Sequence, residues 1–88
     1  MDFRWNSWNV EHLARHRVSP ESAEEAIEGA RSPYPRRIDD EKRLVWGTSD
    51  RGELLQAIFV LDEDGSVFVL HARPLTETEK SRHRRQKR

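Results

Sequence analysis

Arginine and histidine side chains lie near the ends of the expected helices and strands, and their chemistry suits a phosphate ligand. Arg15 and His16 close an N-terminal helical segment, Arg43 opens an expected strand and Arg73 closes another. Guanidinium groups bind phosphate in bidentate geometry and cannot lose their charge, and imidazole transfers protons near neutral pH. Such element ends can converge at one rim of a small sheet. Taken singly, each arginine is expected to be a solvated surface residue.

The sequence offers less support for other chemistries. His12 and His16 lie one helical turn apart, but the residues between them lack the glutamate of a zinc-protease helix, and no third ligand is evident. We therefore expect no metal site. The chain has no cysteine and no glycine-rich phosphate loop, so thiol chemistry is excluded and no cofactor is expected. We expect His71 to be hydrogen-bonded at a sheet surface, and the tryptophans to serve in packing.

The formal charge of zero hides a segregation of charge along the chain. Residues 76–88 carry six Lys/Arg against two Glu, a net charge of +4, which leaves −4 for residues 1–75. A local basic field attracts phosphates even where the total charge is neutral. The basic segment 80–88 therefore predicts a nucleic-acid contact, and the alternative is a solvated, frayed tail.

Two short antiparallel helices are expected near the amino terminus. Asn6 is a competent N-cap for the first, which should end near His16 or Arg17. Ser19 caps the second, and Pro20 suits its first helical position. The positions expected to be buried are Val10, Leu13 and Ala14 in the first helix and Ala23, Ala26, Ile27 and Ala30 in the second. The glutamates expected to face outward are Glu21, Glu24, Glu25 and Glu28.

An antiparallel meander is expected to follow. Its strands are Arg43 to Thr48, Leu54 to Leu61 and Val67 to Ala72, joined by turns at 49–52 and 62–65 that each contain a glycine. The middle segment is apolar except at Gln56, so it should be the central strand. Short strands are also expected at residues 3–5 and 36–38. These elements predict an α+β fold in which a small antiparallel sheet of about four strands packs against the helices.

The final helix is predicted to begin with a capping box formed by Thr76 and Glu79. From Lys80 to Arg88 there is no apolar residue, so this helix cannot dock through a hydrophobic stripe. We expect residues 1–88 to form one domain, since the length allows only a small core. No apolar run approaches the length of a membrane span, and the amino terminus does not look like a secretion signal, which predicts a soluble, cytoplasmic protein without membrane contact.

The succession of these pieces resembles the BrnT family of type II toxin–antitoxin ribonucleases. The resemblance covers FRWN, then EHLARHRVSPESAEEAI, KRLVWGTSDRGELLQAIFV and VFVLHARPLTETEK, and so spans nearly the whole chain in order. It implies a RelE-like fold and RNA cleavage without a metal. It also implies a BrnA-like antitoxin as partner, with DNA bound only indirectly through that antitoxin.

The resemblance also implies roles for individual residues. Matching the family's basic residue and histidine at the end of the first helix gives Arg15 and His16. The arginine that opens the long strand corresponds to Arg43, and that of the family's Ser-Ala-Arg ending corresponds to Arg73. We expect these residues and His83 to be catalytic, with the arginines on phosphate and His16 or His83 as acid or base. The cations expected to bind RNA are Lys42, Lys80, Arg82, Arg84 and Arg85.

Four positions depart from the family pattern. Arg17 stands where glycine is common after the histidine, and it would cost about 1 kcal/mol if its backbone is left-handed. Glu53 replaces a frequent arginine, His71 replaces the serine before Ala-Arg, and His83 replaces a late tyrosine.

The function that the resemblance implies is that of an endoribonuclease toxin that inhibits translation. The alternative is a decayed toxin that keeps the fold as an inactive module binding a protein partner or RNA.

Overall fold

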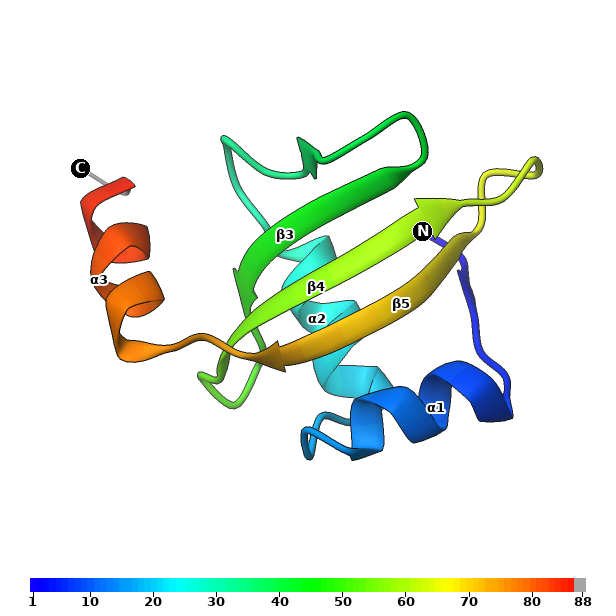
Figure 1. Ribbon diagram of the computed structural model, residues 1–88, viewed down its shortest axis with the longest axis horizontal. Helices are drawn as coiled ribbons and strands as arrows, with labels where there is room; N and C mark the ends of the chain where they lie inside the picture. The colour runs from blue at the N-terminus through cyan, green and yellow to red at the C-terminus, as the bar shows by residue number, and fades with distance from the viewer. Residues whose placement is uncertain (87–88) are drawn as a thin grey trace.

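The computed structural model has an α+β fold with three helices and one five-stranded sheet, and it describes residues 1–86 (Figure 1). The helices are α1 (Ser7–Ala14), α2 (Pro20–Glu28) and α3 (Glu77–Gln86). The strands are β1 (Phe3–Arg4), β2 (Arg36–Arg37), β3 (Lys42–Thr48), β4 (Leu54–Leu61) and β5 (Val67–Pro74). Their order in the sheet is β1-β5-β4-β3-β2.

The meander is confirmed, and β4 is its central strand. β3, β4 and β5 pair antiparallel, and the turn glycines Gly52 and Gly65 both adopt positive φ, as the turns require. The expectation of about four strands was one too low. Two-residue strands form at both edges, because β1 pairs parallel with β5 and β2 pairs antiparallel with β3.

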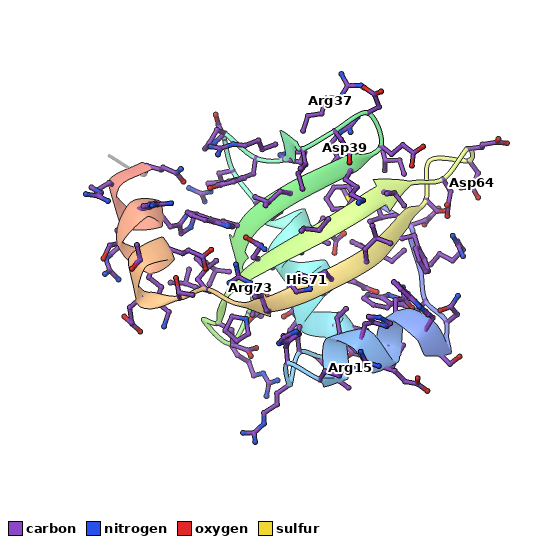
Figure 2. All side chains as sticks on the ribbon, in the orientation of Figure 1. Arg15, Arg37, Asp39, Asp64, His71 and Arg73 are labelled. Atoms are coloured by element: carbon purple, nitrogen blue, oxygen red, sulfur yellow. The ribbon has the colours of Figure 1, made fainter. Side chains whose placement is uncertain are left out.

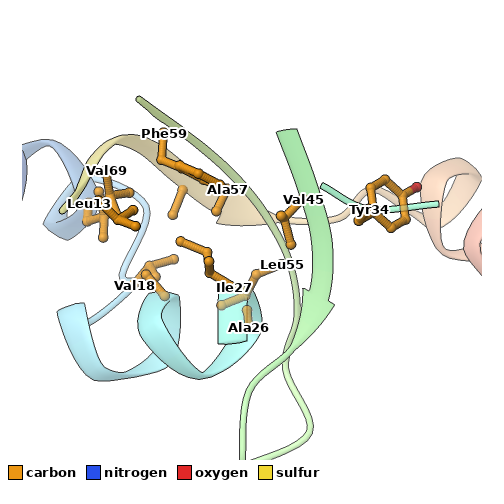
Figure 3. Close-up of a cluster of buried hydrophobic side chains, with 13 residues drawn as sticks. Leu13, Val18, Ala26, Ile27, Tyr34, Val45, Leu55, Ala57, Phe59 and Val69 are labelled. Carbon is orange, nitrogen blue, oxygen red and sulfur yellow. The ribbon is translucent and has the colours of Figure 1, made fainter. Parts of the chain in front are cut away.

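The hydrophobic core lies between the sheet and α1 and α2 (Figures 1 and 3). Leu55, Ala57 and Phe59 supply the side of β4 that faces these helices. Gly47 of β3 is required at this contact, because a Cβ there would overlap the backbone carbonyl of Ala26 in α2. Helix α2 and the sheet are therefore held at backbone contact.

The buried stripe of α1 differs from the expected one. Asn9 and Leu13 are fully buried, whereas Val10 is 37% exposed and Ala14 is also exposed. Asn9 can be buried because its polar groups are satisfied: its Oδ1 accepts the Asn6 N–H at 2.8 Å, and its Nδ2 donates to the Arg4 carbonyl at 3.1 Å. The polar Asn9 is thus buried in the stripe of α1, where hydrophobicity alone would have placed Val10.

Arg17 adopts the left-handed conformation, with φ of 59°. It follows α1, which ends at Ala14 rather than near His16 or Arg17, and the Val18 N–H closes the helix end by donating to the Leu13 carbonyl at 3.1 Å. The strain anticipated for a side chain at this position is therefore present.

Replacing Arg17 with glycine should stabilise the protein by about 0.5–1 kcal/mol, since relief of left-handed strain exceeds the added flexibility of the unfolded chain. The free energy of unfolding from a denaturant titration measures this change. Arg17→Ala is the matched control, because it removes the charge and keeps the strain. Equal stabilisation by both variants would show that the charge, not the backbone, is responsible.

Helix α2 starts as expected and buries Ala23, Ala26 and Ile27, whereas Ala30 lies beyond its end and is half-buried. Two of its glutamates do not merely face outward. Glu24 accepts a hydrogen bond from Trp5 Nε1 at 2.7 Å, and Glu25 accepts one from the Asp50 backbone N–H at 3.0 Å. These two carboxylates tie the amino terminus and the β3–β4 turn to α2. Of the four glutamates, only Glu21 and Glu28 are exposed, and Glu24 and Glu25 are half-buried.

Helix α3 starts as expected, because Thr76 and Glu79 form the capping box. It docks without an apolar stripe of its own. His83 is 7% exposed, and its ring packs against Tyr34 and Trp46, with ring centroids 6.2 and 6.0 Å away. The Tyr34 hydroxyl also donates to Gln86 Oε1 at 2.8 Å. Aromatic and polar contacts thus replace hydrophobic packing.

None of the three helices described has the length and apolarity needed to cross a membrane.

Candidate functional site

The pleat of β4 divides the sheet into two faces. Leu55, Ala57 and Phe59 point toward the helices, so Gln56 and Ile58 point to the opposite side. We call this side the outer face. Cross-strand pairing adds Lys42, Leu44 and Trp46 from β3 and Phe68, His71 and Arg73 from β5.

Arg73 and Arg43 lie on different faces and do not form one phosphate clamp. Arg73 pairs with Gln56 on the outer face, whereas Arg43 pairs with Phe59 on the helix side. Three positions of β4 separate the two pairs, about 10 Å along the strand. The expected convergence of these arginines at one rim therefore does not occur in this structure.

Arg73 is held by a carboxylate from α3. Its two terminal nitrogens donate to Glu79 at 2.7 and 2.8 Å, and Nη1 also reaches the Pro74 carbonyl at 3.0 Å. The Arg73 guanidinium lowers the pKa of Glu79 to about 2, so this carboxylate is ionised at neutral pH. A phosphate at Arg73 would have to share the guanidinium with Glu79 or displace it.

Two histidines meet at the edge of β5. The rings of His16 and His71 lie edge to face, with centroids 5.4 Å apart. Burial lowers the pKa of His71, and the nearby charges of His16, Arg73 and His12 lower it further. His71 is therefore poised to be a neutral imidazole at pH 7. The pair unites one predicted catalytic residue, His16, with His71, which the sequence places at a sheet surface and does not predict to be catalytic.

A β-bulge explains why His71 reaches this position. Val67 and Val69 face the core, so strict alternation would send residue 71 inward as well. The register shifts near Ile58, where His71 becomes the partner of Ile58 on the outer face. The sequence held one signal of this placement: His71 lies two residues before Arg73, and residues two apart in a strand share a face.

Arg15 and His12 flank the histidine pair on the α1 side. Arg15 is exposed at the C-cap of α1, which lies across from His71 and Arg73 on β5 (Figure 2). His12 stacks on Trp8 at 3.9 Å, and its Nδ1 contacts the Trp8 carbonyl at 2.7 Å. Within residues 1–86 there is no group of three or more potential metal ligands. Arg15, His16, His71 and Arg73 thus form the candidate site, which we call the histidine edge.

His83 lies away from the histidine edge. It packs on Trp46 of β3, and two strand spacings, about 10 Å, separate β3 from β5. The structure thus brings Arg15, His16 and Arg73 into one region, and it leaves His83 and Arg43 outside it.

The cations expected to bind RNA are spread over two regions. Lys42 is exposed at the start of β3, and Arg82, Arg84 and Arg85 are exposed on α3. Lys80 is half-buried and pairs with Glu77 at 3.3 Å. Lys87 and Arg88 of the basic segment lie outside the described residues.

Glu53 has a structural role at its unusual position. Its Oε1 accepts hydrogen bonds from the hydroxyls of Ser22 and Ser49, each at 3.0 Å, and both serines are buried. The carboxylate therefore joins the β3–β4 turn to α2. An arginine has no acceptor, so it could not receive the hydrogen bonds that these two hydroxyls donate.

Comparison of the chain with models of protein families, with curated proteins and with solved structures finds no match.

Proposed function

We propose that this protein is a metal-independent endoribonuclease, the toxin component of a type II toxin–antitoxin pair. The observation that carries the proposal is the His16–His71 pair, 5.4 Å between ring centroids, beside Arg73. Two adjacent imidazoles can act as the general base and the general acid, and so supply both proton transfers of RNA cleavage. The resemblance to BrnT toxins, drawn from the order of the sequence motifs, supports the same reaction.

The reaction would start with attack of the RNA 2′ oxygen on the adjacent phosphorus. Neutral His71 takes the proton of the 2′ hydroxyl, and protonated His16 gives a proton to the 5′ oxygen as the bond from phosphorus to that oxygen breaks. The products are a 2′,3′-cyclic phosphate and a free 5′ hydroxyl. Arg73, with Arg15 in support, stabilises the charge that develops on the phosphorane oxygens.

Incubation of the purified protein with RNA in excess EDTA tests the proposal. We expect cleavage, with 2′,3′-cyclic phosphate ends, at a rate that EDTA does not change. RNA that stays intact at high protein concentration would contradict the assignment.

A specific observation favours a second candidate, an RNA- or partner-binding module without catalysis. Arg73 is already engaged by Glu79, and Arg43 lies on the other face, so the arginines do not form a free cluster. A decayed toxin would bind RNA or its partner and leave RNA uncleaved in the same assay.

A cellular experiment tests the partner. We propose that a BrnA-like antitoxin, encoded beside this gene, binds and neutralises the protein. Expression of the chain alone should arrest growth, and co-expression of the neighbouring reading frame should relieve the arrest. Growth arrest that persists with the neighbour would count against the toxin–antitoxin pairing.

The exposed arginines of α3 should contribute RNA affinity rather than chemistry. Replacing Arg82, Arg84 and Arg85 with glutamine should flatten the log–log salt dependence of single-stranded RNA binding by about 2 units, if each contacts one phosphate. Single-turnover cleavage at saturating protein should change little, since these residues are separate from the histidine edge. Filter binding across a salt series measures the slope. An unchanged slope would leave these arginines as solvated residues or antitoxin contacts.

A further inference from the structure

A groove opens between α3, the end of β3 and the segment that follows α2. Its volume is about 640 Å³, within the range of small-ligand sites. The side chains that give it chemical character are Arg31, Tyr34, Trp46, Thr48, His83 and Gln86. The proposed cleavage chemistry uses none of them.

The lining of the groove suits a nucleobase. Trp46 offers aromatic surface, backed by the buried rings of Tyr34 and His83 that pack against it, and Thr48 and Gln86 offer donors and acceptors for the edge of a base. Arg31 brings a positive charge to the rim. No described residue that lines the groove is acidic, although the chain has 16 Asp and Glu in all. A base could therefore enter the groove without bringing its negatively charged phosphate close to a carboxylate of the lining.

The walls of the groove are fixed in place before any ligand binds. Trp46 Nε1 donates to Gln56 Oε1 at 3.1 Å, and the Tyr34 hydroxyl donates to Gln86 at 2.8 Å. The floor is equally constrained, because Gly47 lies against the backbone of Ala26. Side chains held in this way lose little freedom on binding, which favours affinity.

Cross-strand pairing connects the groove to the histidine edge. Trp46 pairs with Gln56, and Gln56 pairs with Arg73, so these three residues form one row across the outer face. The row spans two strand spacings, about 10 Å. An RNA strand that crosses this face would bring a base to the groove while a nearby phosphate lies beside Arg73.

We infer that this groove binds an unpaired nucleobase next to the cleaved phosphate and so sets the sequence preference of the proposed ribonuclease. The role of the groove in choosing the cleavage site rests on the proposed function, but the binding of a base does not require catalysis. The ligand class is a base of single-stranded RNA. A side chain of a protein partner is the competing occupant.

The test uses short 2′-O-methyl oligonucleotides of A, C, G or U, which cannot be cleaved because the 2′ oxygen is blocked. The indole N–H signals of the three tryptophans are followed by NMR. The Trp46 signal should shift on titration, while those of Trp5 and Trp8 stay in place. One base should bind at least about fivefold more tightly than the others, as base stacking and edge contacts would produce.

A variant pair then isolates the groove. Arg31→Gln combined with Thr48→Ala should reduce the base preference to about twofold, and both residues are exposed, so the fold is retained. Arg37→Gln is the matched control, since it removes one exposed arginine at the other end of β3 and should keep the preference.

The outcomes separate the two proposals. Oligonucleotides that leave the Trp46 signal unchanged, or a preference that survives the groove variant, would overturn the inference. A shift of Trp46 caused by the neighbouring gene product and not by RNA would also overturn it, and would assign the groove to a protein. A shift by RNA in a protein that cleaves none would uphold the groove while refuting the nuclease.

Discussion

Replacing His71 with alanine should lower the rate of RNA cleavage by a factor of about 100 to 10,000, the usual contribution of a positioned acid or base. His16→Ala should have a similar effect, because the two rings serve the same phosphate and lie 5.4 Å apart. The double variant should be little worse than the poorer single variant, since residues that act as a unit are not additive. Single-turnover cleavage of a short RNA measures each rate.

The pH dependence adds a second signature of the pair. The pKa of His71 is lowered, first by burial and then by His16, Arg73 and His12, so the base is neutral at pH 7. Acidification should therefore reduce cleavage only near a pKa below about 6.5, where His71 becomes protonated. In a His71→Gln variant this acidic limb should vanish along with most of the activity.

Two other histidines provide controls. His12→Ala should keep cleavage within a few fold, because His12 lies one turn away from the pair and stacks on Trp8. A greater loss for His83→Ala than for His71→Ala would contradict the assignment. It would place the proton transfers at the other end of the sheet, beside Trp46.

Local signals predicted most of the fold. The apolar run from Leu54 to Leu61, bounded by two glycine turns, matches β4 residue for residue, because a central strand is specified by burial on both sides. Thr76 and Glu79 predicted the start of α3 through a local capping box. The hydrophobic periodicity of α1 did not predict the burial of Asn9, because that burial depends on hydrogen bonds to Asn6 and Arg4.

The candidate site was harder to predict because it depends on strand register. A shift of one residue moves a side chain to the other face of a sheet. Pairing with Phe59 sends Arg43 to the helix side, and the bulge in β5 turns His71 outward beside His16. Neither fact follows from residue types. The ion pair between Arg73 and Glu79 could not be predicted either, since it depends on the direction in which α3 leaves the sheet.

Arg73 can be a ligand of the phosphate, an anchor of α3, or both, and two substitutions distinguish these roles. Arg73→Ala should lower turnover by about a hundredfold or more if the guanidinium stabilises the phosphorane. Glu79→Gln removes the charge of the partner but keeps an oxygen for the capping box, which accepts glutamine as well as glutamate. It should therefore release Arg73 toward RNA and leave cleavage within a few fold of the original protein, or raise it.

If Arg73 serves only to anchor α3, a different pattern is expected. Arg73→Ala removes both hydrogen bonds to Glu79, 2.7 and 2.8 Å long, and Glu79→Gln removes the one to Oε2 together with the negative charge, so both substitutions should then weaken α3 and reduce cleavage. Amide hydrogen exchange in α3 reports the anchoring separately from the chemistry. Because the pKa of Glu79 is about 2, this carboxylate stays ionised at the near-neutral pH of the assay. Losses of cleavage in both variants that follow the loss of protection in α3 would remove Arg73 from the proposed active site and leave the histidines to act with Arg15.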